Sequence, residues 1–418
     1  MGVSEGKLRA RDDRSVRAWP NTPGSAEDTD CSSSVTTQEF IHGQVSDIRY
    51  RNMKPKAVPY ALAAWLLVPV AMLFIVLPSA RAQQDEPEDS QAFAPLFASH
   101  TPLAVTIEAP LTTLMKDRPV DEYLDGIFSF TGDDGAEHAL NLKIRTRGKY
   151  RRQEEHCDFA PIRLNFRKKQ VVGTEFAGQD KLKLVTHCKS KQSYYEQLLL
   201  REYLAYRFLN VMTNNSYSVR LLQINYVDTA GTKPMSKLGF IIEDEDAVAE
   251  RTGMYPIRSG DILSDDLDGK QQNLVNVFQY LIGNTEFSQY RSEPGEYCCH
   301  NIDLMSATKK APYTPLAYDF DFAGIVNAPY AEPNPRFDHD DVRHRLYRGQ
   351  CRNNELLPGT FQHFLDKKGA IYSIVNDLGP LSSRSRRDVT NYLNDFYKRI
   401  SEVKEVNAEF INKCDEPT

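Results

Sequence analysis

Polar side chains of the types that perform chemistry are concentrated in residues 283–324. Glu286 lies near the start of this stretch, Asn301 lies in its middle, and Asp319 and Asp321 lie near its end. A carboxylate can act as a general base, and carboxylate and amide oxygens bind divalent metal ions such as Mg²⁺. The stretch therefore contains groups that could carry a base and hold a metal ion.

Phosphoryl transfer is the reaction that uses these groups together. It requires a carboxylate that orients the attacking hydroxyl or accepts its proton, and an Asn and an Asp that hold metal ions on the phosphates. It also requires a lysine from the sheet that neutralises phosphate charge. Each group has a candidate in the sequence, in the order in which a kinase-like fold presents them.

Three other interpretations remain open. Asp319 and Asp321 could instead cap the turn that residues 323–324 indicate. Ser-His-Asp hydrolase chemistry is disfavoured because the chain has no Gly-x-Ser-x-Gly motif. A zinc site is the third alternative, although its candidate ligands lack the spacing of structural zinc sites. These candidates are Cys298, Cys299, His300, His339, His344 and Cys351.

The chain before this stretch predicts a β-rich half that is mainly an antiparallel sheet. Residues 132–135, Gly-Asp-Asp-Gly, indicate a hairpin turn. Ser193 and Glu196 have the spacing of a capping box, and apolar periodicity continues this helix to residue 210. Runs rich in β-branched and aromatic residues predict the strands. They lie at 103–107, 126–130, 139–147, 161–166, 181–186, 219–227 and 238–242.

The later half of the chain is mostly helical in pattern. Apolar spacing predicts helices at 271–282, 360–365, 370–378 and 388–410, with Gly283 ending the first. The acidic run 243–246 and the arginine-rich stretch 343–352 are interpreted as solvent-facing, and the latter could alternatively contact an acidic partner. We expect an α+β fold with two lobes, residues 100–245 and 246–414.

On its motifs the chain resembles the spore coat protein H (CotH) family of atypical secreted kinases, over roughly residues 100–325. The motifs are Arg145-Thr146-Arg147-Gly148, residues 161–166, the helix at 193–210, residues 239–243 with Glu250-Arg251, Asn284-Thr285-Glu286, His300-Asn301 and Asp319-Phe320-Asp321. The resemblance implies a two-lobed protein-kinase-like fold. It also implies a secreted or surface domain that uses ATP and Mg²⁺ or Mn²⁺ to phosphorylate Ser or Thr of a protein.

Residue roles follow from the same resemblance. Asp319 would be the main metal ligand, Asp321 its neighbour and alternative, Asn301 the second ligand, and Glu286 the catalytic base. Glu286 stands where the family usually has Asp, and a displacement of about 1 Å can reduce a rate about a hundredfold. The alternative function is therefore a catalytically weak or inactive kinase-fold envelope protein that acts as a binding module.

A lysine of the sheet half would bind the nucleotide phosphates. Lys183 alternates with Leu182 and Leu184, so its side chain points to the opposite face of the strand. Lys143 is the competing candidate. A helix carboxylate should pair with this lysine, and both Glu196 and Glu202 qualify by position, although Glu196 is equally explained by the capping box.

Bulk composition limits the function classes. The chain has 418 residues, 41% hydrophobic and 26% charged, which is ordinary for a globular protein. Its net charge is −6, so no basic surplus indicates nucleic-acid binding. The resemblance to the CotH family implies a protein substrate in the cell envelope or outside a bacterial cell.

The N-terminal region indicates export. Lys54 and Lys56 precede an apolar run at 57–77, and Ala80-Arg81-Ala82 has the form of a signal-peptidase site. Residues 53–82 are therefore a cleaved signal peptide or, through 57–77, a membrane anchor. The polar residues 1–52 are a disordered tail, or translation starts at Met53. Residues 83–99 form a linker.

Cysteine usage agrees with an oxidising compartment outside the cytoplasm. Six cysteines follow the apolar run, an even number that permits three disulfides. Cys157 and Cys188 are the expected pair because each borders a strand in the same half. The disulfide candidates are Cys157, Cys188, Cys298, Cys299, Cys351 and Cys414. Buried free thiols are the alternative.

Overall fold

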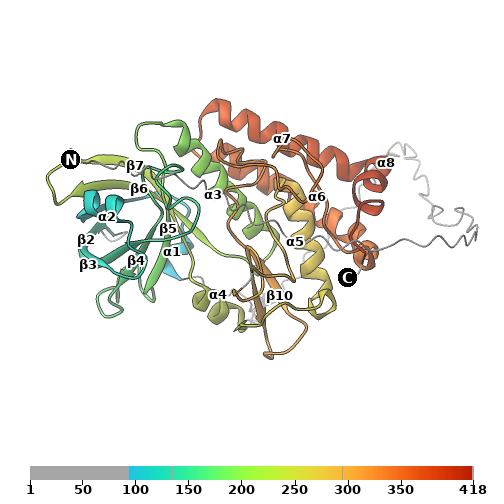
Figure 1. Cartoon of the computed structure of the whole chain (residues 1–418), viewed down its shortest axis with the longest axis horizontal. Helices are drawn as coiled ribbons and strands as arrows, with labels where there is room; N and C mark the ends of the chain where they lie inside the picture. The colour runs from blue at the N-terminus through green and yellow to red at the C-terminus, as the bar shows by residue number, and fades with distance from the viewer. Residues whose placement is uncertain (1–93, 133–134, 294, 417–418) are drawn as a thin grey trace, which may run out of the picture. The chain divides into compact units, whose positions relative to one another are not determined.

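The computed structural model describes residues 94–132, 135–293 and 295–416 (Figure 1). The predictions for residues 1–52, for the signal peptide or anchor at 53–82, and for most of the linker at 83–99 lie outside the described residues. Among the described residues, no helix is both long enough and apolar enough to cross a membrane.

A closed barrel of seven strands forms the N-terminal half. Its strand order is β1-β2-β3-β4-β5-β7-β6, and β6 pairs with β1 to close it. The strands are β1 Leu103–Ala109, β2 Leu124–Thr131, β3 Glu137–Thr146, β4 Ile162–Phe166, β5 Lys181–Val185, β6 Val219–Asp228 and β7 Met235–Ile242. All seven strands were predicted at these places, and the hairpin between β2 and β3 is present. The prediction missed that the sheet closes and that β1 and β6 run parallel.

Alternation along the strands separates the barrel interior from its outer surface. Leu182 and Leu184 are fully buried among the apolar side chains that fill the barrel. Lys183 lies between them and points outward, beside Arg163 on the neighbouring strand β4. The outer face of β4 and β5 therefore presents cations, as the sequence predicted for Lys183.

A long helix, α3, follows the barrel strand β5 and connects the barrel to the helical half. It packs against β6 and β7 on one side and against α6 on another (Figure 1). The helices are α1 Pro95–Ala98, α2 Leu111–Asp117, α3 Tyr194–Met212, α4 Glu245–Thr252, α5 Gly269–Ile282, α6 Leu357–Asp377, α7 Ser383–Ser401 and α8 Val403–Val406. Shorter turns of other helix types lie at Ser264–Asp266, Cys351–Leu356 and Asn407–Ile411.

A small three-stranded sheet lies in the C-terminal half, in the order β10-β9-β8. Its strands are β8 Tyr255–Ile257, β9 Ile302–Ser306 and β10 Thr314–Ala317. The α+β class and the order of a β-rich half followed by a helical half are as predicted. The hairpin of β9 and β10 is the element that positions the candidate site.

Some helix predictions need correction. The helices expected at 360–365 and 370–378 are one continuous helix, α6. The helix expected at 388–410 starts earlier, because the Ser382 side chain caps the amide of Ser385, and it ends at Ser401. The capping box at Ser193 does not form: this serine makes no side-chain cap, and Glu196 pairs with Lys237 instead.

Three disulfides join the six cysteines. They connect Cys157 with Cys188, Cys298 with Cys299, and Cys351 with Cys414. The first is the pair that the sequence predicted. Disulfides persist in oxidising compartments, so the three bonds indicate a location outside the cytoplasm.

Candidate functional site

The β9–β10 hairpin brings Asn301 and Asp319 to the same end of a small sheet. Ile302 begins β9 and faces Ala317, which ends β10. One residue beyond this pair, the backbone N–H of Tyr318 donates to the Asn301 carbonyl at 3.1 Å. The two predicted metal ligands thus come from opposite strands but lie at one end of the hairpin.

Both residues adopt the left-handed backbone conformation. Asn301 has φ 54° and Asp319 has φ 60°. Non-glycine residues rarely adopt positive φ, although Asn and Asp do so more readily than most. The backbone N–H of Asp319 donates to the buried Tyr206 hydroxyl at 2.9 Å, which holds the turn against α3. Such backbone conformations are concentrated at functional sites.

The loop after α5 positions Glu286 beside this hairpin end. Helix α5 stops at Gly283, whose φ is 66°, as the sequence predicted. The Glu286 amide donates to the Asn284 side chain at 2.9 Å, and the Asn301 amide group donates to the Glu286 carbonyl at 2.8 Å. This bond leaves the Asn301 carbonyl oxygen Oδ1 without a donor among the described residues. Asn301 can therefore offer that oxygen to a metal ion.

Glu286 is paired with His300, a partner that the sequence analysis did not assign. The Glu286 Oε1 and His300 Nε2 atoms lie 3.1 Å apart. The hydrogen bond to His300 lowers the pKa of Glu286, and the same bond raises the pKa of His300. The charge of Asp319 also raises the pKa of His300, so the base candidate and the metal-ligand candidate belong to one site.

Arg151 links the predicted helix carboxylate to the aspartates. Its guanidinium lies 3.1 Å from Glu202 and 3.2 Å from Asp321, and 4.0 Å from Asp319. Arg151, Glu202 and Asp321 have side chains that are 9%, 2% and 7% exposed. Buried charges require partners of opposite sign, and this arginine serves two buried carboxylates at once. The role of Arg151 could not be predicted from local sequence patterns, because its partners are distant in the chain.

Asp319 and Asp321 therefore differ in what they can bind. Asp321 accepts a hydrogen bond from the Tyr330 hydroxyl at 3.1 Å and forms an ion pair with Arg151 at 3.2 Å, and burial raises its pKa to about 6. The Asp319 side chain is 46% exposed, and its closest ionic contact is the 4.0 Å approach of Arg151. Asp319 is the carboxylate that is open to a ligand, whereas Asp321 is already engaged.

Two cations lie beside Asp319 without partners of their own. The side chains of Arg147 and Lys183 form no hydrogen bond or ion pair within the part of the chain that the structure describes. Burial lowers the pKa of both; the charge of Asp319 opposes this shift for Arg147, and the charge of Asp303 and, less strongly, that of Asp319 oppose it for Lys183. The Arg147 Nε atom is buried and unpaired, and the Lys183 ammonium lies 5.0 Å from the Tyr318 ring centre. Both side chains are half-buried, and cations that are partly removed from water without an ionic partner favour an anionic ligand.

The competing candidates lie elsewhere. Lys143 is 48% exposed and pairs with Asp125 at 3.2 Å. Glu196 pairs with Lys237 at 2.8 Å. Lys183 and Glu202 therefore remain the candidates for the nucleotide-binding lysine and its helix carboxylate. They do not pair with each other, because Glu202 forms its ion pair with Arg151.

The oxygen donors near Asp319 are few for a divalent metal ion. The described residues contain no group of three or more His, Cys, Asp and Glu side chains that could hold a metal ion. Mg²⁺ is commonly held by one or two protein carboxylates together with substrate phosphates. Asp319 with Asn301 Oδ1 fits that smaller set, and Arg147 and Lys183 would face the phosphates. The zinc alternative lacks free thiols because Cys298, Cys299 and Cys351 are in disulfides.

The arginine-rich stretch is largely internal, contrary to the expectation, although its last arginine, Arg352, is exposed. Arg345 is buried and lies 2.6 Å from Asp395, and it also donates to the Leu281 carbonyl at 3.3 Å. Arg348 donates to the carbonyls of Thr285 and Phe287, on both sides of Glu286. The acidic run is also partly internal, because Glu243 is buried against Arg251 at 2.9 Å.

No family model matches the chain, and no curated protein matches it. The resemblance to CotH kinases therefore stays a prediction that rests on short motifs and on the geometry described above.

Proposed function

We propose that this protein is an exported, CotH-like atypical kinase that transfers the γ-phosphoryl group of ATP to a Ser or Thr hydroxyl of a protein. The observation that carries the proposal is the pair of half-buried cations without ionic partners, Arg147 and Lys183, whose pKa values respond to the charge of the 46% exposed Asp319 carboxylate. Such an arrangement suits a phosphate chain whose negative charge is bound from one side by cations and from the other through a metal ion.

The metal ion would be Mg²⁺ or Mn²⁺, held by Asp319 and by Oδ1 of Asn301, and it would neutralise charge on the transferred group. Arg147 and Lys183 would bind phosphate oxygens. Arg151 would keep its bonds to Glu202 and Asp321, so that the carboxylates beside the site stay fixed.

Glu286 would act on the protein hydroxyl. Its carboxylate orients the attacking oxygen, a new bond forms between that oxygen and the γ-phosphorus, and the bond from the γ-phosphorus to ADP breaks. The hydroxyl proton passes to Glu286. The lowered pKa of Glu286 makes it a weak base, so its main contribution is orientation of the hydroxyl, with proton acceptance late in the step.

The alternative is a binding module with a kinase-like fold. The specific observation in its favour is that Arg151 already neutralises Glu202, the carboxylate that a nucleotide-binding lysine would use. A module of this kind would bind a protein partner without consuming ATP.

The test is ATP binding and phosphoryl transfer by the full-length oxidised protein with Mg²⁺ or Mn²⁺. Wild type should bind ATP in a metal-dependent manner and transfer label from γ-labelled ATP. Asp319→Asn should reduce transfer about a hundredfold or more, because the metal loses its charged ligand. The matched control is Asp125→Asn, which removes an exposed aspartate that pairs with Lys143 on the barrel. If wild type and Asp319→Asn are both folded and neither binds ATP, the kinase proposal is wrong. The binding module is then the remaining proposal.

A further inference from the structure

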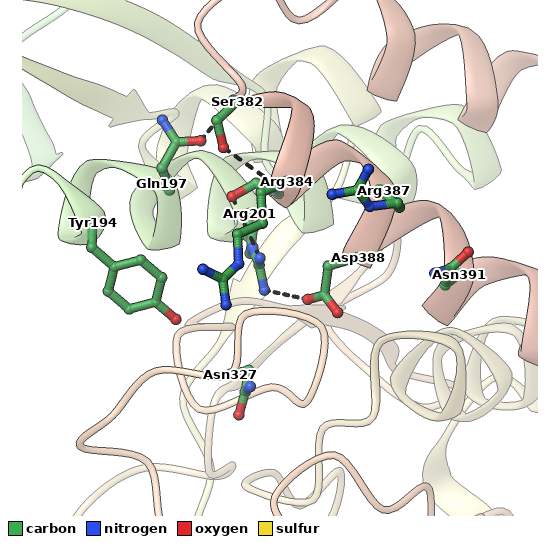
Figure 2. A pocket seen from close by; sticks show the side chains of 10 residues that line it. Tyr194, Gln197, Arg201, Asn327, Ser382, Arg384, Arg387, Asp388 and Asn391 are labelled. Atoms are coloured by element: carbon green, nitrogen blue, oxygen red, sulfur yellow. Dashed lines mark hydrogen bonds and ion pairs between the residues drawn. The ribbon is translucent and has the colours of Figure 1, made fainter.

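A polar cavity lies between the start of α3 and the start of α7. The proposed phosphoryl transfer does not use this cavity. It has a volume of about 490 Å³. Figure 2 shows the side chains that line it, with the Arg201 guanidinium joined to Asp388. The lining that matters for its chemistry consists of Tyr194, Arg201, Asn327, Arg384, Arg387 and Asp388.

The charges that line this cavity are mostly positive. Three arginines face a single carboxylate, Asp388. That carboxylate is already neutralised, because it lies 2.7 Å from Arg201 and 3.0 Å from Arg343, an arginine from outside the lining. Arg384 and Arg387 are exposed and make no ion pair with any described residue. The cavity therefore retains positive charge that its own residues do not balance.

Arg384 and Arg387 also lie near the N-terminus of helix α7, where a positive charge is unfavourable. The N-terminus of a helix carries partial positive charge, which favours acidic side chains and disfavours basic ones. Helix α7 has 19 residues, and its first turn contains no acidic residue. Arg386, in the same turn, already has hydrogen-bond acceptors, since it donates to the carbonyls of Leu378 and Leu381 at 3.0 and 3.2 Å. Arg384 and Arg387 have no such partner among the described residues, so an anion in the cavity would offset their unfavourable position.

Arg201 forms the inner wall of the cavity. It is only 4% exposed, its terminal nitrogens donate to Asp388 at 2.7 Å and to the Ser385 hydroxyl at 3.4 Å, and its buried Nε atom has no hydrogen-bond partner. An anion held by Arg384 and Arg387 would lie near this third guanidinium, which lines the same cavity. Arginines present paired N–H groups that match phosphate oxygens, and phosphate contacts of this kind are charge-assisted.

We propose that this cavity is a binding site for a phosphate monoester. The dianionic phosphate group would lie among Arg201, Arg384 and Arg387 at the start of α7. The volume falls in the range of pockets that hold small organic ligands, and Tyr194 and Asn327 line the space beyond the arginines. The ligand is therefore a phosphorylated side chain or another small organic phosphate, rather than a bare ion.

The experiment is a calorimetric titration of the full-length oxidised protein with O-phosphoserine, a phosphoserine peptide and inorganic phosphate, at constant ionic strength. Wild type should bind the two monoesters saturably and more tightly than it binds inorganic phosphate. Arg384→Gln/Arg387→Gln should weaken monoester binding by about tenfold or more, because two charge-assisted contacts are lost. Both positions are exposed, so the variant should stay folded.

Two further variants separate the cavity from other cationic surfaces. Arg167→Gln/Lys169→Gln removes two exposed cations from the barrel and should leave monoester binding unchanged. Lys183→Gln removes a cation of the proposed ATP site, and this variant should bind the monoesters as tightly as wild type does. The proposal is overturned if wild type shows no saturable binding, or if the Arg384/Arg387 variant binds as tightly as wild type. It is also overturned if inorganic phosphate binds as tightly as phosphoserine.

Discussion

At the scale of single residues, Arg151 determines how the candidate site is held. It connects the loop after β3, helix α3 through Glu202, and the segment after β10 through Asp321. Removing one partner from a buried ion pair leaves a charge without compensation, which typically costs about 3–5 kcal/mol. Asp319 lies at the open edge of this network, where its carboxylate can receive a ligand without breaking a buried pair.

The Glu286–His300 pair makes a prediction about pH. The folded pKa of His300 is raised above its ordinary value of 6.5, so its stabilising contribution is complete below that pH and is lost as pH rises through the raised pKa. The folded pKa of Glu286 is lowered below 4.5, so its contribution is present above that pH and is lost as pH falls through the lowered pKa. The pair is therefore complete between about pH 4.5 and pH 6.5.

Glu286→Gln should lower the pKa of His300, because the neutral amide no longer stabilises the imidazolium. Titration of the His300 ring signals by NMR measures this directly. His100 is an internal control: burial lowers its pKa to about 4, and the charge of Glu286 does not contribute to that shift, so its pKa should not move. An unchanged pKa of His300 in the variant would show that the two side chains do not interact in solution.

At the scale of elements, the site depends on how the loop after α5 meets α7. Gly283 ends α5 at positive φ, and a side chain there would overlap the hydroxyl of Tyr392 on α7. Gly324, which follows the aspartates, packs against the same hydroxyl. The backbone N–H of Gly324 donates to the Gly283 carbonyl at 2.9 Å. The segments that carry Glu286 and Asp319 are thus joined through two glycines and one tyrosine.

Gly283→Ala should destabilise the protein by about 1–3 kcal/mol, because it combines a strained backbone with a steric overlap. The measurement is the free energy of unfolding in denaturant. Gly369→Ala is the matched control: this glycine lies within α6, and an added methyl group would meet nothing within 4 Å. It should stabilise by about 0.5–1 kcal/mol, since alanine favours a helix interior. Equal effects at the two positions would contradict the proposed contact with Tyr392.

At the scale of the whole described region, disulfides tie distant segments together. Cys351 and Cys414 are 63 residues apart and join the start of α6 to the C-terminal end of the described chain, while Cys157 and Cys188 close a shorter loop of separation 31 in the barrel half. Cross-links that close long loops restrict the unfolded chain and typically stabilise by about 2–4 kcal/mol.

Cys351→Ala/Cys414→Ala should therefore lower the free energy of unfolding by about 2–5 kcal/mol, with a matching fall in Tm. The check is thermal unfolding of wild type and variant, each with and without reductant. Reductant should lower the Tm of wild type more than that of the variant, because the variant has already lost one cross-link. If reductant lowers both equally, the 351–414 bond does not contribute to stability.

Local sequence patterns predicted most of the elements. The alternation of apolar and polar residues predicted where all seven barrel strands lie and that the Lys183 side chain points out of the barrel, because side chains in a strand alternate with period two. Glycine at 283 marked the end of α5, since a left-handed residue commonly follows a helix. The pair Cys157–Cys188 followed from two cysteines that border strands in one half. The helix ends near Ser382 and Ser401 were less well predicted, because capping and tertiary contacts set them.

The sequence by itself determined the α+β class, the order of the elements, and the residue types available for phosphoryl transfer, since these depend on neighbours along the chain. Only the tertiary structure decided barrel closure, because β1 and β6 are joined by contacts distant in sequence. It also decided that Arg151 pairs with Glu202, that His300 pairs with Glu286, and that Asp321 is engaged while Asp319 stays open. Side-chain partners depend on burial and on long-range packing, which no local pattern encodes.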